Sequence, residues 1–368
     1  MKNMLRQPTW HRGWREFLCN RALRAMAGAP QSAGTFRVGI IGAGRVARRH
    51  VYGYRKTGKA VVVAIADPDL KQRAKAQRRW RIPNLYSDFG EMLKQERLDM
   101  VSVCAPPRFH FAAVLAAAEA GVKAVLCEKP IARNLHEADE MIRVCRERGV
   151  RLAIGHQRRF APQHQLAKAL LEQRTIGALR HVIAECPPDI LRAGIHSLDL
   201  LLDRLGPLAR VTASLSDGRG GKVPGPEEAS FAYQSGDRDS WILLEFRSGL
   251  QATVHVDTRS SHHAKMTFLG ENGVMEVWTD GGMRYRRLQD NAWTVPALEL
   301  NPYIDDFYLE IESIFSSLES NTPVAVPGEA GRDSLEIVLA ILTSNQEGRS
   351  IPLPLAESSV ARSTLDAA

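Results

Sequence analysis

The sequence predicts two joined domains: a doubly wound parallel α/β domain over residues 36–156, and an α+β domain with a large, open, mainly antiparallel sheet over residues 157–352. Short apolar runs alternate with helical patterns in the first part, and a glycine-rich turn directly follows the first run. Hairpin-like turns separate the runs of the second part. The length of 368 residues suits two domains. Residues 1–35 and 353–368 are expected to be an N-terminal extension and a C-terminal tail.

Five apolar runs predict the strands of the parallel sheet. Helical patterns such as Glu137–Arg148 lie between them. Because the runs are apolar throughout, without alternation, helices should cover both faces of this sheet. The predicted strands are Val38–Ile41, Val61–Ala66, Met100–Cys104, Lys123–Cys127 and Leu152–Ile154.

Four further runs predict the antiparallel sheet. Short turns such as Ser248-Gly249 separate them, which is typical of consecutive hairpin strands. Two helices, Ile304–Glu319 and Gly331–Gln346, are expected to follow, before Pro352 and Pro354 end the domain. The predicted strands are Trp241–Phe246, Gln251–Thr258, Lys265–Leu269 and Val274–Thr279.

The composition is that of an ordinary globular protein, with 44% apolar and 24% charged residues. The net charge of +8 is spread along the chain, and its densest run, residues 71–81, includes one aromatic residue, Trp80. We therefore expect a solvated helix face there, and no binding of nucleic acid. No apolar run reaches the roughly 18 residues of a membrane helix. The nearest, Phe109–Cys127, contains Glu119 and Lys123, so we expect no membrane span.

The cysteines and histidines indicate neither disulfides nor a metal site. Five cysteines without a Cys-x-x-Cys pair do not suit a disulfide framework or a zinc site, and a reducing cytoplasm fits best. His262-His263 has no further ligand at a suitable spacing, so no metal is expected there.

The first 35 residues form a basic segment in which apolar residues recur at helical spacing, from Trp10 to Met26. The segment lacks the continuous apolar core of a secretory signal. Three interpretations remain open for it: a poorly ordered extension, a helix that docks on a partner subunit or a membrane surface, and an organellar transit peptide.

The turn Gly42-Ala-Gly-Arg-Val-Ala47 directly follows the first predicted strand and opens a helix, which is the setting of a Rossmann dinucleotide site. Gly42 allows the tight turn, Gly44 lets the backbone approach a pyrophosphate, and Ala47 lets the helix pack on the strand. The free N–H groups at the helix N-terminus favour the phosphate.

Asp67 ends the second predicted strand, at about the expected 20 residues further on. Its carboxylate can accept hydrogen bonds from the ribose hydroxyls but would repel a 2′-phosphate. The sequence therefore favours NAD over NADP, although Lys71 and Arg73 lie near enough in the sequence to weaken that preference.

Four motifs in order carry a family resemblance: residues 38–50 around the glycine turn, Ala105-Pro-Pro-Arg-Phe-His110, Cys127-Glu128-Lys129-Pro130, and Gly194-Ile-His-Ser-Leu-Asp199. Over residues 36–352 this set resembles the Gfo/Idh/MocA family of NAD(P)-dependent oxidoreductases. The resemblance implies reversible hydride transfer between a nicotinamide cofactor and a hydroxyl or carbonyl group of a sugar, inositol or sugar-derived substrate. It also implies a homodimer or homotetramer that assembles through the exposed face of the antiparallel sheet.

The resemblance extends to individual site residues. Lys129 is expected to stabilise the reacting oxygen and exchange its proton, and His196 matches a histidine that accepts a proton or contacts substrate, although a structural role for His196 remains open. The expected cofactor contacts are Gly42, Gly44, Arg45, Val46, Asp67, Ala105, Pro106, His110, Glu128 and Lys129, and the expected substrate contacts are Lys129, Gln157, Arg158, Arg192, His196 and Asp199.

Arg192 departs from the family pattern, since members commonly carry an aspartate four residues before the histidine. One hypothesis is that Arg192 binds an anionic group of the substrate, because a guanidinium fits a carboxylate or phosphate. A surface arginine at a helix start is the alternative. Two other functions also stay open for the chain: redox-neutral glycoside hydrolysis or elimination with NAD, and a non-catalytic NAD-bound sensor or regulator.

Overall fold

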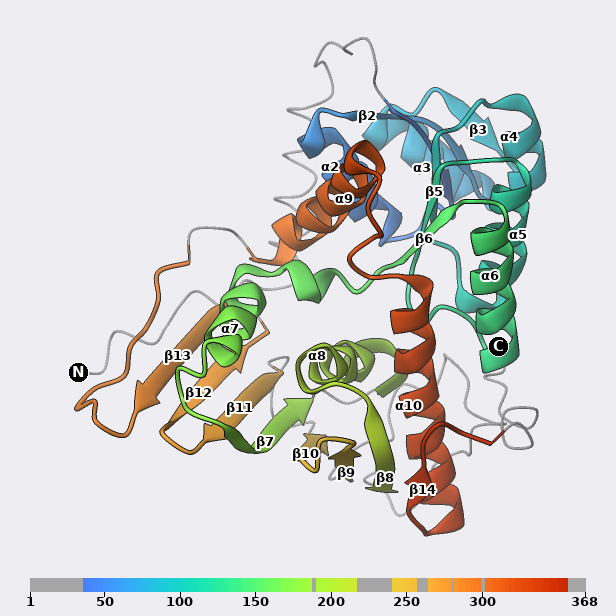
Figure 1. The fold of residues 1–368 in the computed structure, drawn as a ribbon. Helices are drawn as coiled ribbons and strands as arrows, with labels where there is room; N and C mark the ends of the chain where they lie inside the picture. Colours follow the sequence, from blue (N-terminus) through green and yellow to red (C-terminus); the bar gives the residue numbers. More distant parts are fainter. Residues whose placement is uncertain are drawn as a thin grey trace.

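The computed structural model describes residues 36–186, 190–216, 240–256, 264–279, 281–298 and 302–356. These residues form two sheets, one at each end of the molecule, with helices packed around and between them (Figure 1). The predictions for the N-terminal extension, for His262-His263 and for most of the C-terminal tail lie outside the described residues.

The first sheet has six parallel strands in the order β3-β2-β1-β4-β5-β6, which is the Rossmann order. All five predicted strands are present, and the sequence reading missed only β3, which is three residues long. The strands are β1 (Phe36–Ile41), β2 (Ala60–Ala66), β3 (Asn84–Tyr86), β4 (Met100–Val103), β5 (Ala124–Cys127) and β6 (Arg151–Ile154). Both faces carry helices: α2 (Ala47–Thr57), α3 (Leu70–Trp80), α4 (Phe89–Gln95), α5 (His110–Glu119) and α6 (Leu135–Glu147).

The second sheet has eight strands in the order β13-β12-β11-β7-β10-β9-β8-β14. Its only parallel pair among the described strands is β7 with β10, so the prediction of a mainly antiparallel sheet is confirmed. The predicted strands correspond to β9 (Ser240–Phe246), β10 (Gln251–Val256), β11 (Lys265–Gly270) and β12 (Gly273–Trp278), whereas the sequence reading missed β7 (Leu179–Cys186), β8 (Leu208–Ser214), β13 (Gly282–Arg287) and β14 (Ile351–Pro352).

Helices cover one face of the second sheet, with α8 (Ile195–Leu205) and α7 (Pro162–Glu172) above its strands in Figure 1. Side chains alternate accordingly along β9 and β10, where Phe246, Val254 and Val256 are buried in the core. Trp241 lies on the opposite face and is 45% exposed.

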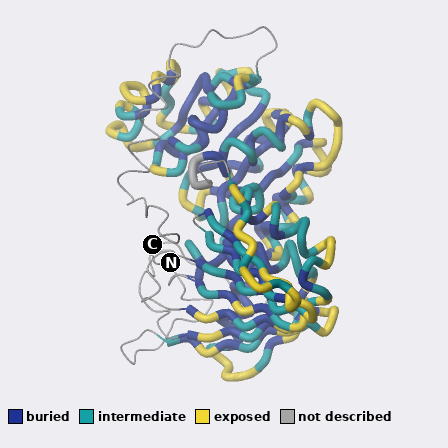
Figure 2. The backbone as a smooth tube through the Cα atoms, turned by 90° about the vertical axis from the view of Figure 1, so that its left-hand side faces the viewer, coloured by how far each residue is buried: buried dark blue, intermediate teal, exposed yellow. Residues whose placement is uncertain are grey.

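Two late helices connect the sheets. α9 (Pro302–Ser320) packs on α2, where Gly53 allows close contact with Phe307 and Ile311. α10 (Gly328–Glu347) contacts α6 and β6 on one side and α8 and β8 on the other. The segment between them hydrogen-bonds the edge of the first sheet, where Ile154 N donates to Val326 O at 3.0 Å. Figure 2 shows buried backbone running through both halves of the molecule.

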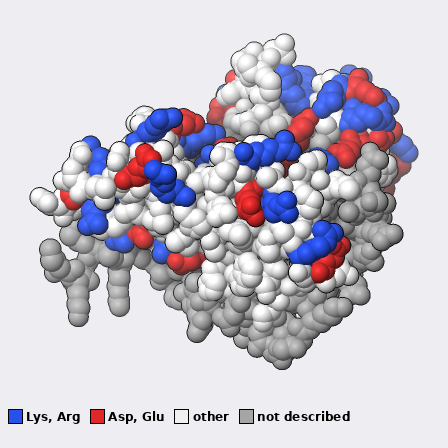
Figure 3. Space-filling view, turned by 60° about the horizontal axis from the view of Figure 1, so that its bottom comes forward, with Lys and Arg blue, Asp and Glu red and all other residues white. Residues whose placement is uncertain are grey.

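Charged side chains of both signs lie in small separate groups on the face drawn in Figure 3, with no single basic patch. Among the described residues, no helix is long and apolar enough to cross a membrane.

Candidate active site

The glycine turn between β1 and α2 has the geometry that a dinucleotide requires. Gly42 has a φ of +92°, and a Cβ there would lie 2.8 Å from the backbone of Cys104 and Ala105. A Cβ on Gly44 would meet no atom within 4 Å, so this side of the turn has open space. No side-chain hydrogen bond caps the N-terminus of α2, where Val46 is the N-cap residue and the exposed Arg45 precedes it. These residues fit a pyrophosphate at the helix N-terminus.

Asp67 lies at the end of β2 and braces the turn. Its Oδ2 accepts a hydrogen bond from Ala43 N at 2.7 Å, and its Oδ1 accepts one from Asp69 N at 2.8 Å. Arg73 donates to the main-chain oxygens of Asp67 and Pro68, at 2.6 and 2.9 Å. The carboxylate is therefore beside the glycine turn, where a ribose would reach it, and an arginine lies close to the same turn.

The loop after β4 borders the same edge of the sheet. Ala105 and Pro106 begin this loop, next to the glycine turn. His110 is fully buried, with Nδ1 3.0 Å from Pro130 O and Nε2 2.9 Å from Ala105 O. Both ring nitrogens therefore face main-chain oxygens. These contacts let His110 brace the loop against the Lys129–Pro130 turn, and the cofactor contact expected of His110 stays a prediction.

Glu128 follows β5 and is buried, with Oε1 3.0 Å from His50 Nε2. Burial acts to raise the pKa of this carboxyl group, but the hydrogen bond and charge of His50, with the charges of Lys129 and His110, hold the pKa below its usual value. Glu128 is thus an ionised carboxylate at the end of a parallel strand. Sequence reasoning gave His50 no role, because its partner lies 78 residues further along the chain.

Lys129 and Arg192 meet through the main chain. Lys129 Nζ donates a hydrogen bond to Arg192 O at 2.5 Å. Arg192 lies in a π-helical turn, Ile190–Gly194, that runs directly into α8. π-Helical turns often occur at functional sites, because they re-aim main-chain groups. The lysine of the first domain is therefore bound by the segment that carries His196 in the second.

His196 lies in the first turn of α8 and is almost fully buried, with no partner for Nδ1 among the described residues. Burial lowers the pKa of this imidazole well below its usual value, and the nearby charges of Lys129, Arg158 and Arg49 lower it further. The ring is therefore neutral at pH 7, and a neutral imidazole can accept a proton or a hydrogen bond.

His156, which sequence reasoning did not single out as a site residue, lies beside His196 with the two rings edge-to-face and their centroids 6.0 Å apart. It follows β6 and is 1% exposed, and neither ring nitrogen has a hydrogen-bond partner among the described residues. Its Nδ1 is 3.6 Å from Asp199 Oδ2. Burial lowers the pKa of His156 to about 4, so this ring is also neutral.

Comparison with known proteins assigns this arrangement to a family. Residues 36–156 match the NAD-binding Rossmann model of the Gfo/Idh/MocA oxidoreductases, and residues 190–354 match the C-terminal α/β domain model of the same family. The chain belongs to the Gfo/Idh/MocA oxidoreductase family. It is therefore an NAD(P)-dependent oxidoreductase that acts on CH–OH groups.

Relatives of the chain match it over most of its length. The myo-inositol 2-dehydrogenase of Thermotoga maritima is 27% identical over 348 residues, which cover 86% of this chain and 98% of the relative. The trans-1,2-dihydrobenzene-1,2-diol dehydrogenase of Xenopus tropicalis is 33% identical over 66% of this chain and 75% of the relative. The fold is shared with the WlbA dehydrogenase from Bordetella pertussis in complex with NADH and UDP-GlcNAcA, with a TM-score of 0.71, 23% identity, and coverage of 88% of this chain and 100% of that one.

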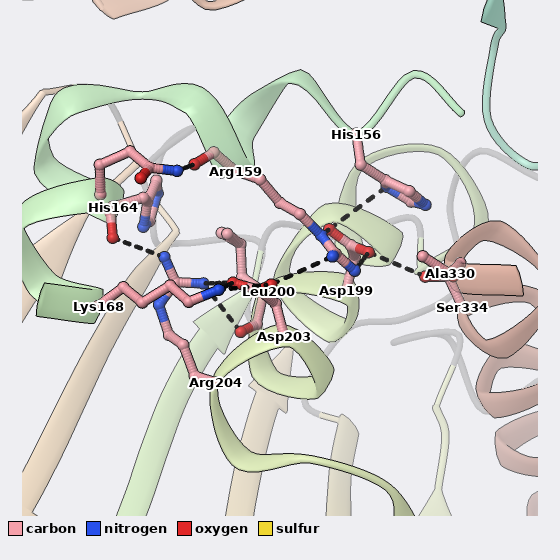
Figure 4. A network of polar contacts seen from close by, with 11 residues as sticks. His156, Arg159, His164, Lys168, Asp199, Leu200, Asp203, Arg204, Ala330 and Ser334 are labelled. Atoms are coloured by element: carbon pink, nitrogen blue, oxygen red, sulfur yellow. Dashed lines mark hydrogen bonds and ion pairs between the residues drawn. The ribbon is translucent and has the colours of Figure 1, made fainter. Parts of the chain in front are cut away.

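In this family member, Asp199 is part of a buried ionic network that joins the elements beneath the site (Figure 4). Arg159 donates to both of its oxygens, at 2.6 and 2.9 Å, and Ser334 of α10 donates to Oδ1 at 3.2 Å. Arg159 also reaches Asp203 at 3.1 Å. We predicted that Asp199 holds substrate or orients His196, but its described contacts are with Arg159, Ser334 and His156. The geometry therefore supports a role in holding the site together.

The remaining predicted substrate residues, Gln157 and Arg158, begin the short 3₁₀ turn Gln157–Phe160. Gln157 is buried, and its Oε1 has no partner among the described residues. Arg158 donates to Thr279 O at 3.0 Å, and its charge helps to lower the pKa of His196. Lys129, Arg158 and His156 are thus brought together around His196, and the main-chain oxygen of Arg192 contacts Lys129.

Proposed function

We propose that this oxidoreductase is a sugar or inositol dehydrogenase that uses NAD and favours a substrate with an anionic group. The observation that carries the proposal is the convergence of Lys129 and His196. Lys129 reaches Arg192 O from the first domain, and His196 lies four residues further along the same helical segment. Among the relatives are an inositol 2-dehydrogenase of Rhizobium meliloti and a D-glucoside 3-dehydrogenase of Escherichia coli, which act on the same class of substrate.

Each residue has a distinct part in the proposed reaction. The nicotinamide, when bound, accepts or returns the hydride. Lys129 hydrogen-bonds the reacting oxygen and stabilises the alkoxide as the C–H bond breaks. His196, which is neutral, takes the hydroxyl proton. In the reverse direction His196 returns the proton.

The preference for NAD rests on Asp67. Its carboxylate lies beside the glycine turn and would repel a 2′-phosphate while accepting the two ribose hydroxyls. An Asp67→Ser variant should lose affinity for NADH and bind NADPH no worse than the parent does. Equal loss for both cofactors would contradict this assignment.

The anionic substrate is inferred from the positive charges around His196. The positive charges of Lys129, Arg158 and Arg49 all lower the pKa of this ring. Arg192 precedes His196 in the same helical segment. An arginine fork binds a carboxylate or phosphate with two parallel hydrogen bonds. Arg192→Ala should therefore raise KM about tenfold or more for uronates or sugar nucleotides and change it little for neutral sugars. Arg210→Ala, at an exposed position of β8, should change KM for neither class of substrate.

We also propose a homo-oligomer that assembles through the uncovered face of the second sheet. Cross-strand pairing aligns Ile183 and Leu243 on either side of Thr253, and Trp241 next to His255, on this face. Ile183 is 38% exposed and Trp241 45% exposed. Trp241→Asp should lower the mass measured by light scattering, while Leu288→Asp, at an exposed position after β13, should leave it unchanged.

The decisive experiment follows absorbance of the reduced nicotinamide with NAD⁺ and, separately, NADP⁺ across sugars, inositols, uronates and sugar nucleotides. Lys129→Ala should lower the rate by about 10²–10⁴-fold. Lys123→Ala, an exposed lysine at the start of the same strand, is the matched control and should be fully active. No reduction of either cofactor by any compound, with NADH still bound, would refute the dehydrogenase and favour redox-neutral glycoside cleavage or a sensor.

A further inference from the structure

Helix α2 borders the proposed cofactor site at its N-terminus and contacts Glu128 through His50. Its N-terminus follows the glycine turn, and its buried side carries His50 and Tyr54. A continuous chain of hydrogen bonds starts from Tyr54: its hydroxyl is 2.7 Å from Ser102 Oγ, which is 3.1 Å from His50 Nδ1. His50 Nε2 is 3.0 Å from Glu128 Oε1. All four side chains are buried, so this chain is shielded from solvent.

The chemistry of the four groups sets the direction of the chain. An ionised carboxylate can only accept, so His50 Nε2 must carry a hydrogen and donate to Glu128. Ser102 Oγ lies between His50 Nδ1 and the Tyr54 hydroxyl, and the Tyr54 hydroxyl can also donate to Met100 Sδ at 3.6 Å. Burial raises the pKa of Tyr54, which therefore stays protonated and able to donate. His50 is thus held at both ring nitrogens, and linked hydrogen bonds of this kind polarise one another.

A second buried carboxyl group lies near Glu128. Glu310 of α9 is 2% exposed, and neither of its oxygens has a hydrogen-bond partner among the described residues. Burial raises the pKa of Glu310, and the charges of Glu128 and Asp306 raise it further. Two neighbouring buried carboxyl groups do not both ionise readily. Because only Glu128 is hydrogen-bonded to His50, the negative charge is fixed on Glu128, next to Lys129.

We propose that His50 is a positioning residue for hydride transfer: supported by Ser102 and Tyr54, it fixes an ionised Glu128 beside Lys129 and so links the cofactor-binding end of α2 to the reaction centre. This inference rests on the proposed dehydrogenase function for its kinetic test. Its structural content, a His50 that donates to Glu128 through Nε2, can be measured without any substrate.

The first test therefore needs no activity. The ¹⁵N spectrum of histidine-labelled protein, with the His50 signals assigned from the His50→Gln variant, should show a hydrogen on Nε2 of His50. Tyr54→Phe and Ser102→Ala each remove one hydroxyl group and should shift the Nδ1 signal. Tyr52→Phe is the matched control, because Tyr52 is also buried on α2 but bonds Asp305 at 3.2 Å, outside the chain. A ring with a hydrogen on Nδ1 and none on Nε2 would overturn the proposal.

The second test measures thermal stability, the Kd of NADH by fluorescence, and kcat against pH with a substrate found in the panel. Removing one hydroxyl should lower kcat about fivefold, the effect of one hydrogen bond. His50→Leu should have a larger effect on kcat, which His50→Gln partly restores because its amide can still donate. The acid limb of the profile should move to higher pH in the hydroxyl variants, because Glu128 becomes easier to protonate. Glu128 faces His50, Lys129, His110, Cys104, Cys127 and Glu310.

The possible outcomes separate the two proposals. Variants that lose stability while kcat and the acid limb stay as in the parent and in Tyr52→Phe would show a merely structural chain and refute the positioning role. If no compound in the panel reduces NAD⁺, the dehydrogenase fails. The Kd of NADH then tests the positioning role. A Kd that rises about fivefold in Tyr54→Phe and not in Tyr52→Phe supports this role, and an unchanged Kd refutes it.

Discussion

His156 should make the protein less stable in acid. Burial lowers its pKa from 6.5 to about 4; the charges of Arg159 and Lys129 act in the same direction, and those of Asp199 and Glu128 against it. Between these two values the unfolded chain binds a proton at this ring and the folded chain does not. Stability from a histidine that is buried in its neutral form is therefore fully present above pH 6.5 and is lost as the pH falls toward 4.

The size of the effect follows from the two pKa values. Between pH 7 and pH 5.5, protonation of the unfolded state at one such ring lowers the free energy of unfolding by about 1.2 kcal/mol. His110, His164 and His196 also have lowered pKa values and add to the acid sensitivity of the whole protein. The contribution of His156 must therefore be measured as a difference between two proteins.

Urea unfolding at pH 7 and pH 5.5 gives that difference. Whatever the stability of His156→Gln at either pH value, its loss between pH 7 and pH 5.5 should be about 1.2 kcal/mol smaller than that of the parent. His181→Gln is the control, because His181 lies partly exposed on the outer face of the second sheet, with Nε2 2.9 Å from Thr253 Oγ1. An equal loss in the parent and in His156→Gln would refute the neutral buried ring.

Two further predictions concern the glycine turn and the buried network. Gly42→Ala should unfold at a lower temperature, measured by calorimetry, because its Cβ would meet main-chain atoms at 2.8 Å and φ at this position is positive. Gly44→Ala should keep its melting temperature and bind NADH at least tenfold more weakly, measured by fluorescence titration. A normal NADH affinity of Gly44→Ala would contradict the phosphate site. Arg159→Ala should cost about 3–5 kcal/mol in denaturant unfolding, since it leaves Asp199 buried without its charge partner. Arg143→Ala, which removes exposed ion pairs on a helix, should lower the free energy of unfolding far less. Similar losses for the two variants would contradict this account.

The sequence predicted the elements whose patterns are local. Each of the five continuous apolar runs became a parallel strand, and the glycine turn, with its positive φ at Gly42, is where the spacing placed it. The missed strands lack this signal. β3 is three residues long, β14 is two, and β13 ends in two exposed arginines. β7 does alternate, with Val182, Ala184 and Cys186 buried, so a period-two count would have found it.

The site was predictable only as far as its motifs reach. Lys129 and His196 come together as the ordered motifs implied, but their supporting partners are distant in sequence. His50 bonds Ser102, 52 residues away, and Asp199 pairs with Arg159, 40 residues away. A helix or strand pattern shows which face is buried, but only the packed fold shows which polar side chains meet there.

The contact between Lys129 and Arg192 explains why the departure from the family pattern does not remove the proposed reaction centre. The hydrogen bond is to the main-chain oxygen of Arg192, so it depends on the π-helical turn and not on the side chain. Truncating Arg192 to alanine therefore leaves the acceptor for Lys129 in place. For this reason, a change in KM for anionic substrates in Arg192→Ala reports recognition by the guanidinium, whereas a fall in kcat for every substrate would mean that the turn itself had moved.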